Sequence, residues 1–172
     1  MSGSTRGRRE GSGPLAGGWS LLAFTWGLAE ATLFFVVPDV LLTVVGVWRP
    51  RHLLRCCLWA TAGATLGGAV VLLWASRGPQ SATHLMLALP AISPELIDRV
   101  FSQLKSNGCW APLLGAFTGV PYKLYALKAQ AAGLSLAGFL AFATPVARLS
   151  RFLLVGFLVR EAARRLLPRW SV

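Results

Sequence analysis

The sequence has little charge for its length, and acidic residues are especially scarce. Only 13% of its 172 residues are charged, and only six of them are aspartate or glutamate. Soluble domains carry about 25% charged residues, so this composition argues against a water-soluble fold. The few carboxylates are never closely clustered, and no nucleophile and base are paired for work on lipid headgroups. We therefore do not expect an enzyme.

Cysteine and histidine are scarce as well, with three and two residues respectively. Cys56, Cys57 and Cys109 form no CxxC pair, and His52 and His84 have no ligand spacing to a carboxylate. This pattern differs from that of zinc sites, and we expect neither a metal nor a cofactor. The adjacent cysteines are either small apolar helix residues or a palmitoylation site at a membrane edge, and the sequence leaves both open.

What the sequence does contain is long apolar runs with arginine and lysine at their ends. Residues 56–76 carry no charge, and at 1.5 Å per residue they can cross about 30 Å of hydrocarbon. The basic residues flank the runs and form no continuous stripe of the kind that binds nucleic acid, which we exclude as a partner. We expect an all-α integral membrane protein with one membrane domain, residues 15–167, between a disordered basic tail, 1–14, and a short tail, 168–172.

The first apolar run, residues 15–47, is interrupted by Glu30 and by the pair Pro38-Asp39. A carboxylate at bilayer depth costs several kcal/mol unless it is paired or faces water. Proline there frees a backbone carbonyl that lipid cannot satisfy, so such breaks are typical of the polar sites of transporters. Arginines precede and follow the run, which places both of its ends in the cytoplasm. The run then enters the membrane and returns as a re-entrant hairpin, and both chain termini are cytoplasmic.

A second run, residues 109–147, is interrupted in the same way. It contains residues that break helices and one central lysine: Gly119, Pro121, Gly133 and Lys123. We expect a second re-entrant hairpin that turns near Pro121 and enters from the opposite face, followed by a last span, 148–167, that begins with Arg148 and Arg151. The first broken run is acidic and the second is basic. Together they form a weak internal repeat of the kind found in transporters with inverted topology.

Two further segments have local signals. Ser93, Pro94 and Glu95 are an N-cap, a first-turn proline and an acid near the positive helix end, which predicts a surface helix over 94–107. Small residues also follow one another along the run 56–76, where they permit close approach of another helix or of a second copy of the chain. They are Ala60, Ala64, Gly67 and Gly68.

Three motifs carry a family resemblance. Glu30-Ala-Thr-Leu-Phe-Phe-Val-Val-Pro38-Asp39-Val-Leu-Leu resembles the first re-entrant motif of the DedA/VTT (SNARE-associated Golgi protein) superfamily. Gly119-Val-Pro121-Tyr122-Lys123, followed by Ala132-Gly133, is similar to the second motif, especially in the small YqaA-like branch. Arg148-Leu-Ser-Arg151-Phe152 resembles the arginine pair of that branch's last helix.

The resemblance implies a two-hairpin fold and movement of phospholipid or polyisoprenyl-phosphate headgroups between leaflets, as in a lipid scramblase or flippase-like transporter. It also implies anionic headgroups as partners, in endomembranes (ER or Golgi) of a eukaryote or the inner membrane of a bacterium. The sequence departs from the larger DedA proteins, which place arginines where Thr118 and Leu124 stand; here Lys123 supplies the charge.

Two hypotheses about the charged residues therefore stay open. In the first, they form a transport site that contacts the headgroup. In the second, they are structural bridges in an assembly factor that moves nothing. The residues concerned are Glu30, Asp39, Lys123, Arg148 and Arg151.

Overall fold

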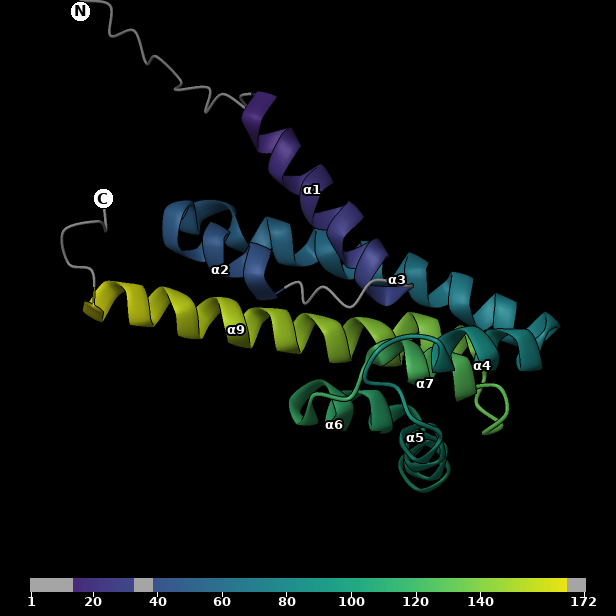
Figure 1. The fold of residues 1–172 in the computed structure, drawn as a ribbon. Coiled ribbons are helices and arrows are strands. Elements are labelled where there is room, and N and C mark those ends of the chain that lie inside the picture. Colours follow the sequence, from purple (N-terminus) through teal and green to yellow (C-terminus); the bar gives the residue numbers. More distant parts are fainter. Residues whose placement is uncertain (1–13, 33–38, 167–172) are drawn as a thin grey trace, which may run out of the picture.

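The computed structural model describes residues 14–32 and 39–166, and within these ranges all regular structure is helical (Figure 1). The expected all-α class is therefore confirmed. Both predicted tails lie outside the described residues, except Pro14, which begins the first helix. The helices are α1 (Pro14–Ala31), α2 (Asp39–Trp48), α3 (Leu53–Arg77), α4 (Pro79–Leu87), α5 (Pro94–Asn107), α6 (Ala111–Thr118), α7 (Tyr122–Lys128), α8 (Leu136–Gly138) and α9 (Thr144–Leu166).

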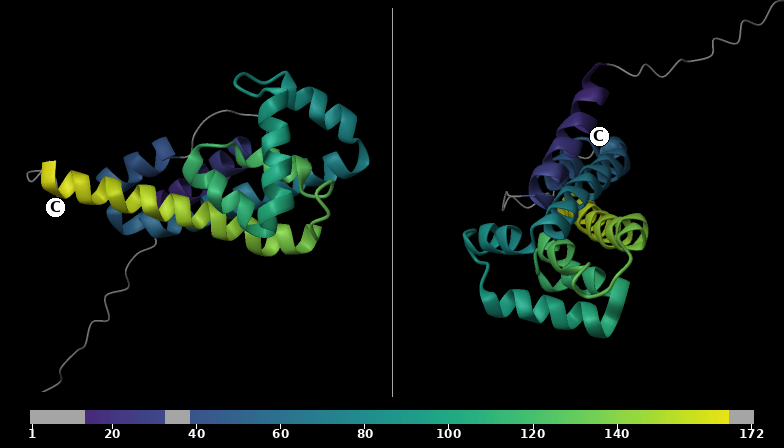
Figure 2. Two further views of the ribbon diagram at one scale, coloured as in Figure 1. Left: turned by 90° about the horizontal axis from the view of Figure 1, so that it is seen from below. Right: turned by 90° about the vertical axis from the view of Figure 1, so that its right-hand side faces the viewer.

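Within the described ranges, two helices are long and apolar enough to cross a membrane. A 3₁₀ turn at Pro50–His52 leads directly into α3, which gives a helix of 28 residues, Pro50–Arg77. The second has the same length and runs from Leu136 to Ala163. At 1.5 Å per residue each is about 40 Å long. The two lie side by side and run in opposite directions (Figures 1 and 2).

The last helix begins earlier than the sequence predicted. We expected a span that starts at Arg148, whereas the helix starts at Leu136 and contains Pro145. A π-helical turn, Phe139–Ala143, comes just before this proline, and the Thr144 N–H binds the Phe139 carbonyl. The wider turn accommodates a residue that has no N–H and whose ring would crowd a regular helix. Proline here therefore marks a local widening and not a helix end.

Helix α1 packs against α3 with almost no space between the backbones. A Cβ atom added to Gly63 would lie 2.0 Å from the Phe24 carbonyl oxygen, and one added to Gly27 would lie 2.1 Å from that of Ala60. The predicted stripe of small residues is therefore covered inside the chain, by α1 and by Tyr122, and it forms no exposed face for a second copy. Its buried members are Ala60, Ala64, Gly67 and Gly68.

The first apolar run is not one continuous helix. Helix α1 ends at Ala31 and α2 begins at Asp39, while Pro38, the predicted turn, lies outside the described residues. Leu42 and Val45 of α2 share a buried cluster with Ala23 of α1 and Phe152 of α9. After the break the chain packs mainly against α9 and also against α3, with little contact with α1.

Helix α5 occupies the predicted residues. The Ser93 hydroxyl accepts a hydrogen bond from the Leu96 N–H at 3.3 Å, and Gly108, at φ 55°, follows the last turn. In Figure 1, α5 is viewed end-on whereas α9 lies across the view, so the two axes are roughly perpendicular; Figure 2 shows the same relation from below. Helix α4, which we did not predict, begins at Gly78-Pro79 directly after α3.

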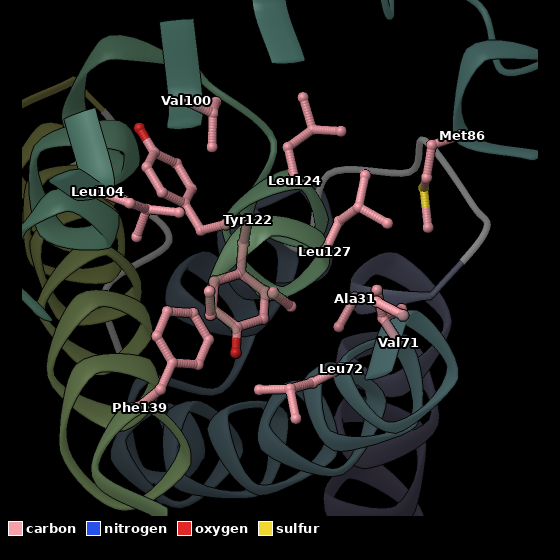
Figure 3. Close-up of a cluster of buried hydrophobic side chains, with 14 of the residues drawn as sticks. Ala31, Val71, Leu72, Met86, Val100, Leu104, Tyr122, Leu124, Leu127 and Phe139 are labelled. Carbon is pink, nitrogen blue, oxygen red and sulfur yellow. The ribbon is translucent and has the colours of Figure 1, made fainter. Parts of the chain in front are cut away.

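The larger core surrounds α7 (Figure 3). Leu124 and Leu127 of α7 are buried, and they belong to one cluster with Leu72 of α3, Val100 of α5 and Met86 of α4. A short helix that is buried on nearly every side is a firm base for polar residues at its ends. Helix α7 begins at Tyr122, immediately before Lys123.

Candidate functional site: a buried cluster of charged side chains

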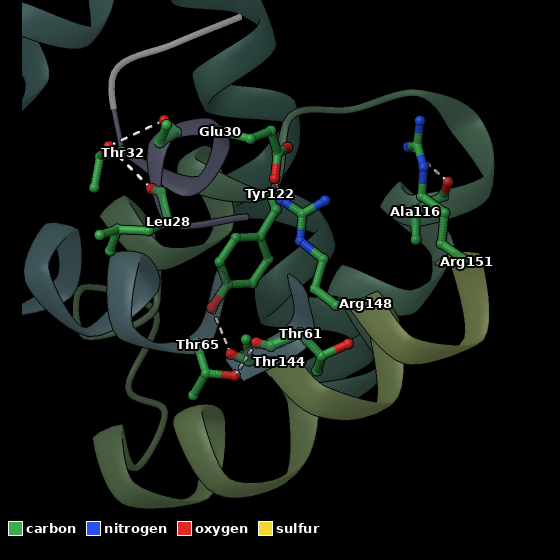
Figure 4. Close-up of polar contacts among 11 residues, drawn as sticks. Leu28, Glu30, Thr32, Thr61, Thr65, Ala116, Tyr122, Thr144, Arg148 and Arg151 are labelled. Atoms are coloured by element: carbon green, nitrogen blue, oxygen red, sulfur yellow. Dashed lines mark hydrogen bonds and ion pairs between the residues drawn. The ribbon is translucent and has the colours of Figure 1, made fainter. Parts of the chain in front are cut away.

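An ion pair joins the first and last helices in the interior of the protein (Figure 4). Glu30, in the last turn of α1, accepts a hydrogen bond from the Arg148 guanidinium of α9. Only 4% of the arginine side chain and 15% of the glutamate side chain are exposed. Arg148 stands near the middle of the apolar helix Leu136–Ala163, far from either of its ends.

Aromatic rings hold the guanidinium from the sides. Its central carbon lies 4.7 Å from the ring centroid of Tyr122 and 5.9 Å from that of Phe152. The Tyr122 ring stacks on Phe139, and its hydroxyl shares a hydrogen bond with the Thr144 hydroxyl. Thr144 in turn donates to the Phe139 carbonyl at 3.1 Å. Cation–π contacts of this kind favour the charged arginine in a place that water reaches poorly.

A glycine of α3 leaves the space that the Tyr122 side chain occupies. A Cβ atom on Gly68 would lie only 2.4 Å from the Tyr122 hydroxyl oxygen. On the same helix, the Thr65 hydroxyl donates to the Thr61 carbonyl at 2.9 Å (Figure 4). Gly68 therefore allows the tyrosine ring to lie between α3 and Arg148.

Lys123 belongs to the same cluster. It is 3% exposed, and it interacts electrostatically with Glu30 and with Arg148. Within the described residues the cluster thus contains one carboxylate and two cations. The guanidinium and the ammonium group are both suited to bind the oxygen atoms of a phosphate.

Two buried donors on the helices that the ion pair joins have no hydrogen-bond partner in the part of the chain that the structure describes. They are Nε of Arg148 and Nε1 of Trp26, which stands one helical turn before Glu30 in α1. Leaving a buried donor unsatisfied costs about 1–3 kcal/mol. These two N–H groups belong to the helices that the ion pair joins, and the Nε–H of Arg148 can donate to an oxygen atom that enters the cluster.

Arg151 takes a separate position. One turn after Arg148, its Nη1 donates to the Ala116 carbonyl at 3.0 Å, and Figure 4 shows its side chain directed toward α6. Ala116 lies in the last turn of α6, where helix carbonyls lack helical partners and attract cations. Arg151 therefore links α9 to the end of a broken helix.

The predicted helix breaks of the second run are present. Gly119 ends α6 with φ 81°, and Pro121, in an extended conformation, precedes α7. Gly133, at φ 83°, lies in the turn between α7 and α8. An L-residue rarely adopts such positive φ values, which explains the two glycines. The break at Gly119–Pro121 places Lys123 in the first turn of α7.

Of the predicted residues, the structure thus joins Glu30, Lys123 and Arg148, and it places Arg151 one turn away. Asp39 is the first residue of α2, but its side chain lies outside what the structure describes, as does Pro38. No group of three or more histidine, cysteine, aspartate or glutamate side chains within the described residues could hold a metal ion.

The sequence did not identify the aromatic part of the cluster. Tyr122, which is 4% exposed and contacts Arg148, was not among the predicted site residues. Phe152 could have been found, since it follows Arg148 at i+4 and such residues share a helix face. No local signal connects Tyr122 with Thr144, which is distant in the sequence.

Comparison with known proteins gives no match to a family model, to a curated protein or to a solved structure.

Proposed function

We propose that this chain is a multi-pass membrane protein that moves phospholipid or polyisoprenyl-phosphate headgroups between leaflets, without covalent chemistry. The observation that carries this proposal is the buried cluster of Glu30, Lys123 and Arg148 near the middle of an apolar helix. The resemblance of three motifs to the DedA/VTT superfamily supports it, and so do the broken helices beside the cluster.

The energetics favour a functional cluster. A charged side chain at the centre of a bilayer costs about 2.5–3.5 kcal/mol even on the most lenient scale. A buried ion pair is a weak source of stability, because well-packed apolar residues serve equally well or better. A joint between α1 and α9 therefore needs neither Glu30 nor Arg148. Intramembrane ionisable residues are retained where a polar solute passes.

In the proposed mechanism the acyl chains stay in the bilayer while the protein replaces the water around the head. Lys123 and Arg148 bind the phosphate, and the Nε–H of Arg148, which has no partner among the described residues, donates to one of the phosphate oxygens. Glu30 holds the cations in place, and its ion pair with Arg148 opens when the phosphate competes for the guanidinium. Asp39 and Arg151, next along the proposed path, complete the site.

The topology belongs to the same proposal. We infer that α1–α2 and α6–α7 are re-entrant hairpins in an inverted pseudo-repeat, with both termini in the cytoplasm. The separation of α1 from α2 and the break at Gly119–Pro121 support this. If α3 and α9 cross the bilayer, α5, roughly perpendicular to α9, lies along its surface. The compartment is the ER or Golgi in a eukaryote and the inner membrane in a bacterium.

One observation favours a second candidate function. The guanidinium of Arg148 is enclosed by Glu30, Tyr122 and Phe152, as it would be in a structural joint. A membrane assembly factor that moves no lipid would contain such a joint and keep it closed.

A reconstitution experiment separates the two functions. The full chain is placed in vesicles that carry a fluorescent lipid, and a membrane-impermeant quencher reports how fast inner-leaflet lipid reaches the outside. Lys123→Ala and Glu30→Gln should abolish this movement in protein that remains folded and inserted. Lys105→Ala, a control at an exposed position of α5, should leave the rate unchanged. If both cluster variants move lipid at the wild-type rate, the assembly factor is the better account.

A further inference from the structure

Arginines from distant parts of the sequence meet at one end of the molecule, which we call the basic end. Its members are Arg49, Arg51, Arg55, Arg160 and Arg165. Two glycines bring these segments together. A Cβ on Gly46 would lie 3.5 Å from Val159 Cγ1, and one on Gly156 would lie 2.9 Å from Leu53 Cδ2. The start of α3 therefore packs against the end of α9, as the left side of Figure 1 shows.

The charge of the basic end is poorly balanced within the protein. All five arginines are exposed. Among described side chains, the acid on these segments is Glu161, which binds Arg165 Nε at 2.9 Å. Placing like charges close together is unfavourable, and an external anionic surface offsets that repulsion.

The other end of the two long helices has a mixed charge. Arg77, Arg99 and Lys105 are exposed there, but Glu95 and Asp98 of α5 are exposed beside them. The excess of positive charge is therefore a property of one end and does not simply follow from the net charge of +11.

The order of side chains along the helices identifies the partner. On α9 the exposed apolar residues Phe157 and Leu158 precede Arg160, and on α3, which runs away from the basic end, exposed Leu54 follows Arg51. Trp48, which is 68% exposed, stands directly before Arg49. This order matches the environments across one leaflet of a bilayer. Apolar residues face the acyl chains, tryptophan lies at the interface, and arginine lies among the headgroups.

We propose that the basic end binds the phosphates of anionic phospholipids in one leaflet, and so fixes the depth and orientation of the protein. This goes beyond the proposed movement of lipid, because anchoring at this surface needs no passage through the interior. Arg49, Arg51 and Arg55 contact the headgroups beside Trp48, and Arg160 contacts them from α9. Each arginine near an anionic surface contributes roughly a fivefold gain in affinity.

Native mass spectrometry of the full chain in detergent tests the proposal by counting bound phosphatidylglycerol and phosphatidylcholine. The wild type should retain phosphatidylglycerol preferentially, and 0.5 M salt, on the order of a 4 Å screening length, should remove the preference. Arg49→Gln/Arg51→Gln/Arg55→Gln should weaken phosphatidylglycerol binding roughly a hundredfold. The control Arg77→Gln/Arg99→Gln/Lys105→Gln removes as much charge elsewhere and should bind like the wild type.

The proposal would be overturned if the two triple variants bound phosphatidylglycerol equally, whether both bound it like the wild type or both had lost it. The position of the arginines would then not matter. If the first triple variant does not fold, the single variants Arg49→Gln and Arg55→Gln should each show a loss of roughly fivefold, and unchanged binding would contradict it. Protein that shows no lipid preference but binds poly(U) through these arginines would have a nucleic-acid surface, which also refutes the proposal.

Discussion

At the scale of single residues, Arg148 is held by contacts of different kinds that can be removed one at a time. Glu30 supplies charge, whereas Tyr122 supplies a ring face and, through its hydroxyl, a link to Thr144. The ring is worth up to about 2 kcal/mol where water is excluded. The hydroxyl is worth about 1 kcal/mol, since a buried hydrogen bond contributes roughly that much.

Tyr122→Phe and Tyr122→Leu should therefore differ. Tyr122→Phe keeps the ring over Arg148 and should lower the free energy of unfolding by roughly 1 kcal/mol. Tyr122→Leu loses the cation–π contact and packing as well, and should cost about 3 kcal/mol or more. Reversible unfolding in mixed micelles measures both values. Equal losses would show that the ring does not hold Arg148.

At the scale of helices, the contact of α1 with α3 depends on backbones that approach without side chains between them. Gly63→Ala would place a methyl group 2.0 Å from the Phe24 carbonyl oxygen, so the helices must separate. We expect a loss of roughly 2 kcal/mol or more in stability. Gly18→Ala is the control, because nothing lies within 4 Å of a Cβ there; it should be neutral or stabilise by up to about 1 kcal/mol.

The stability of helix α5 should depend on pH. Hydrogen bonds from the Ser93 hydroxyl and from its own backbone N–H hold the pKa of the exposed Glu95 carboxyl below its usual 4.5. A lowered folded-state pKa stabilises the helix above the ordinary value, and this contribution disappears as the pH falls through the folded-state pKa. The protection factors of the α5 amides in hydrogen exchange, which compare each rate with the intrinsic rate at the same pH, should therefore fall at low pH.

Ser93→Ala should raise the pKa of Glu95 and remove part of this pH dependence. It should also cost about 1 kcal/mol at neutral pH, since it removes the N-cap. An NMR titration of Glu95 in both proteins measures the shift. An unchanged pKa in Ser93→Ala would show that the hydroxyl does not stabilise the carboxylate.

At the scale of the whole molecule, the sequence predicted those helix ends and breaks that depend only on neighbouring residues. Ser93 and Gly108 set the bounds of α5, and Gly119 with Pro121 sets the break before α7, because capping and positive φ depend on adjacent residues. The start of the last helix was missed, since a π-helical turn accommodates Pro145.

The site was predicted in part for a similar reason. The cost of an isolated charge in apolar surroundings indicated that Glu30 needs a basic partner, and Arg148 is one of the three basic residues among the predicted site residues. Which of the three it contacts, and that Tyr122 encloses the pair, depends on helix packing between distant segments. Likewise, the small residues of α3 indicated close approach of another helix, but the sequence did not show that α1 occupies this face.

The central claim is that the charged cluster moves headgroups and is not merely a joint. The double variant Glu30→Leu/Arg148→Met tests this most directly, because replacing a buried ion pair by apolar residues is often neutral or stabilising. We predict protein as stable as the wild type that no longer moves fluorescent lipid in the vesicle assay. A folded double variant that moves lipid at the wild-type rate would contradict the account.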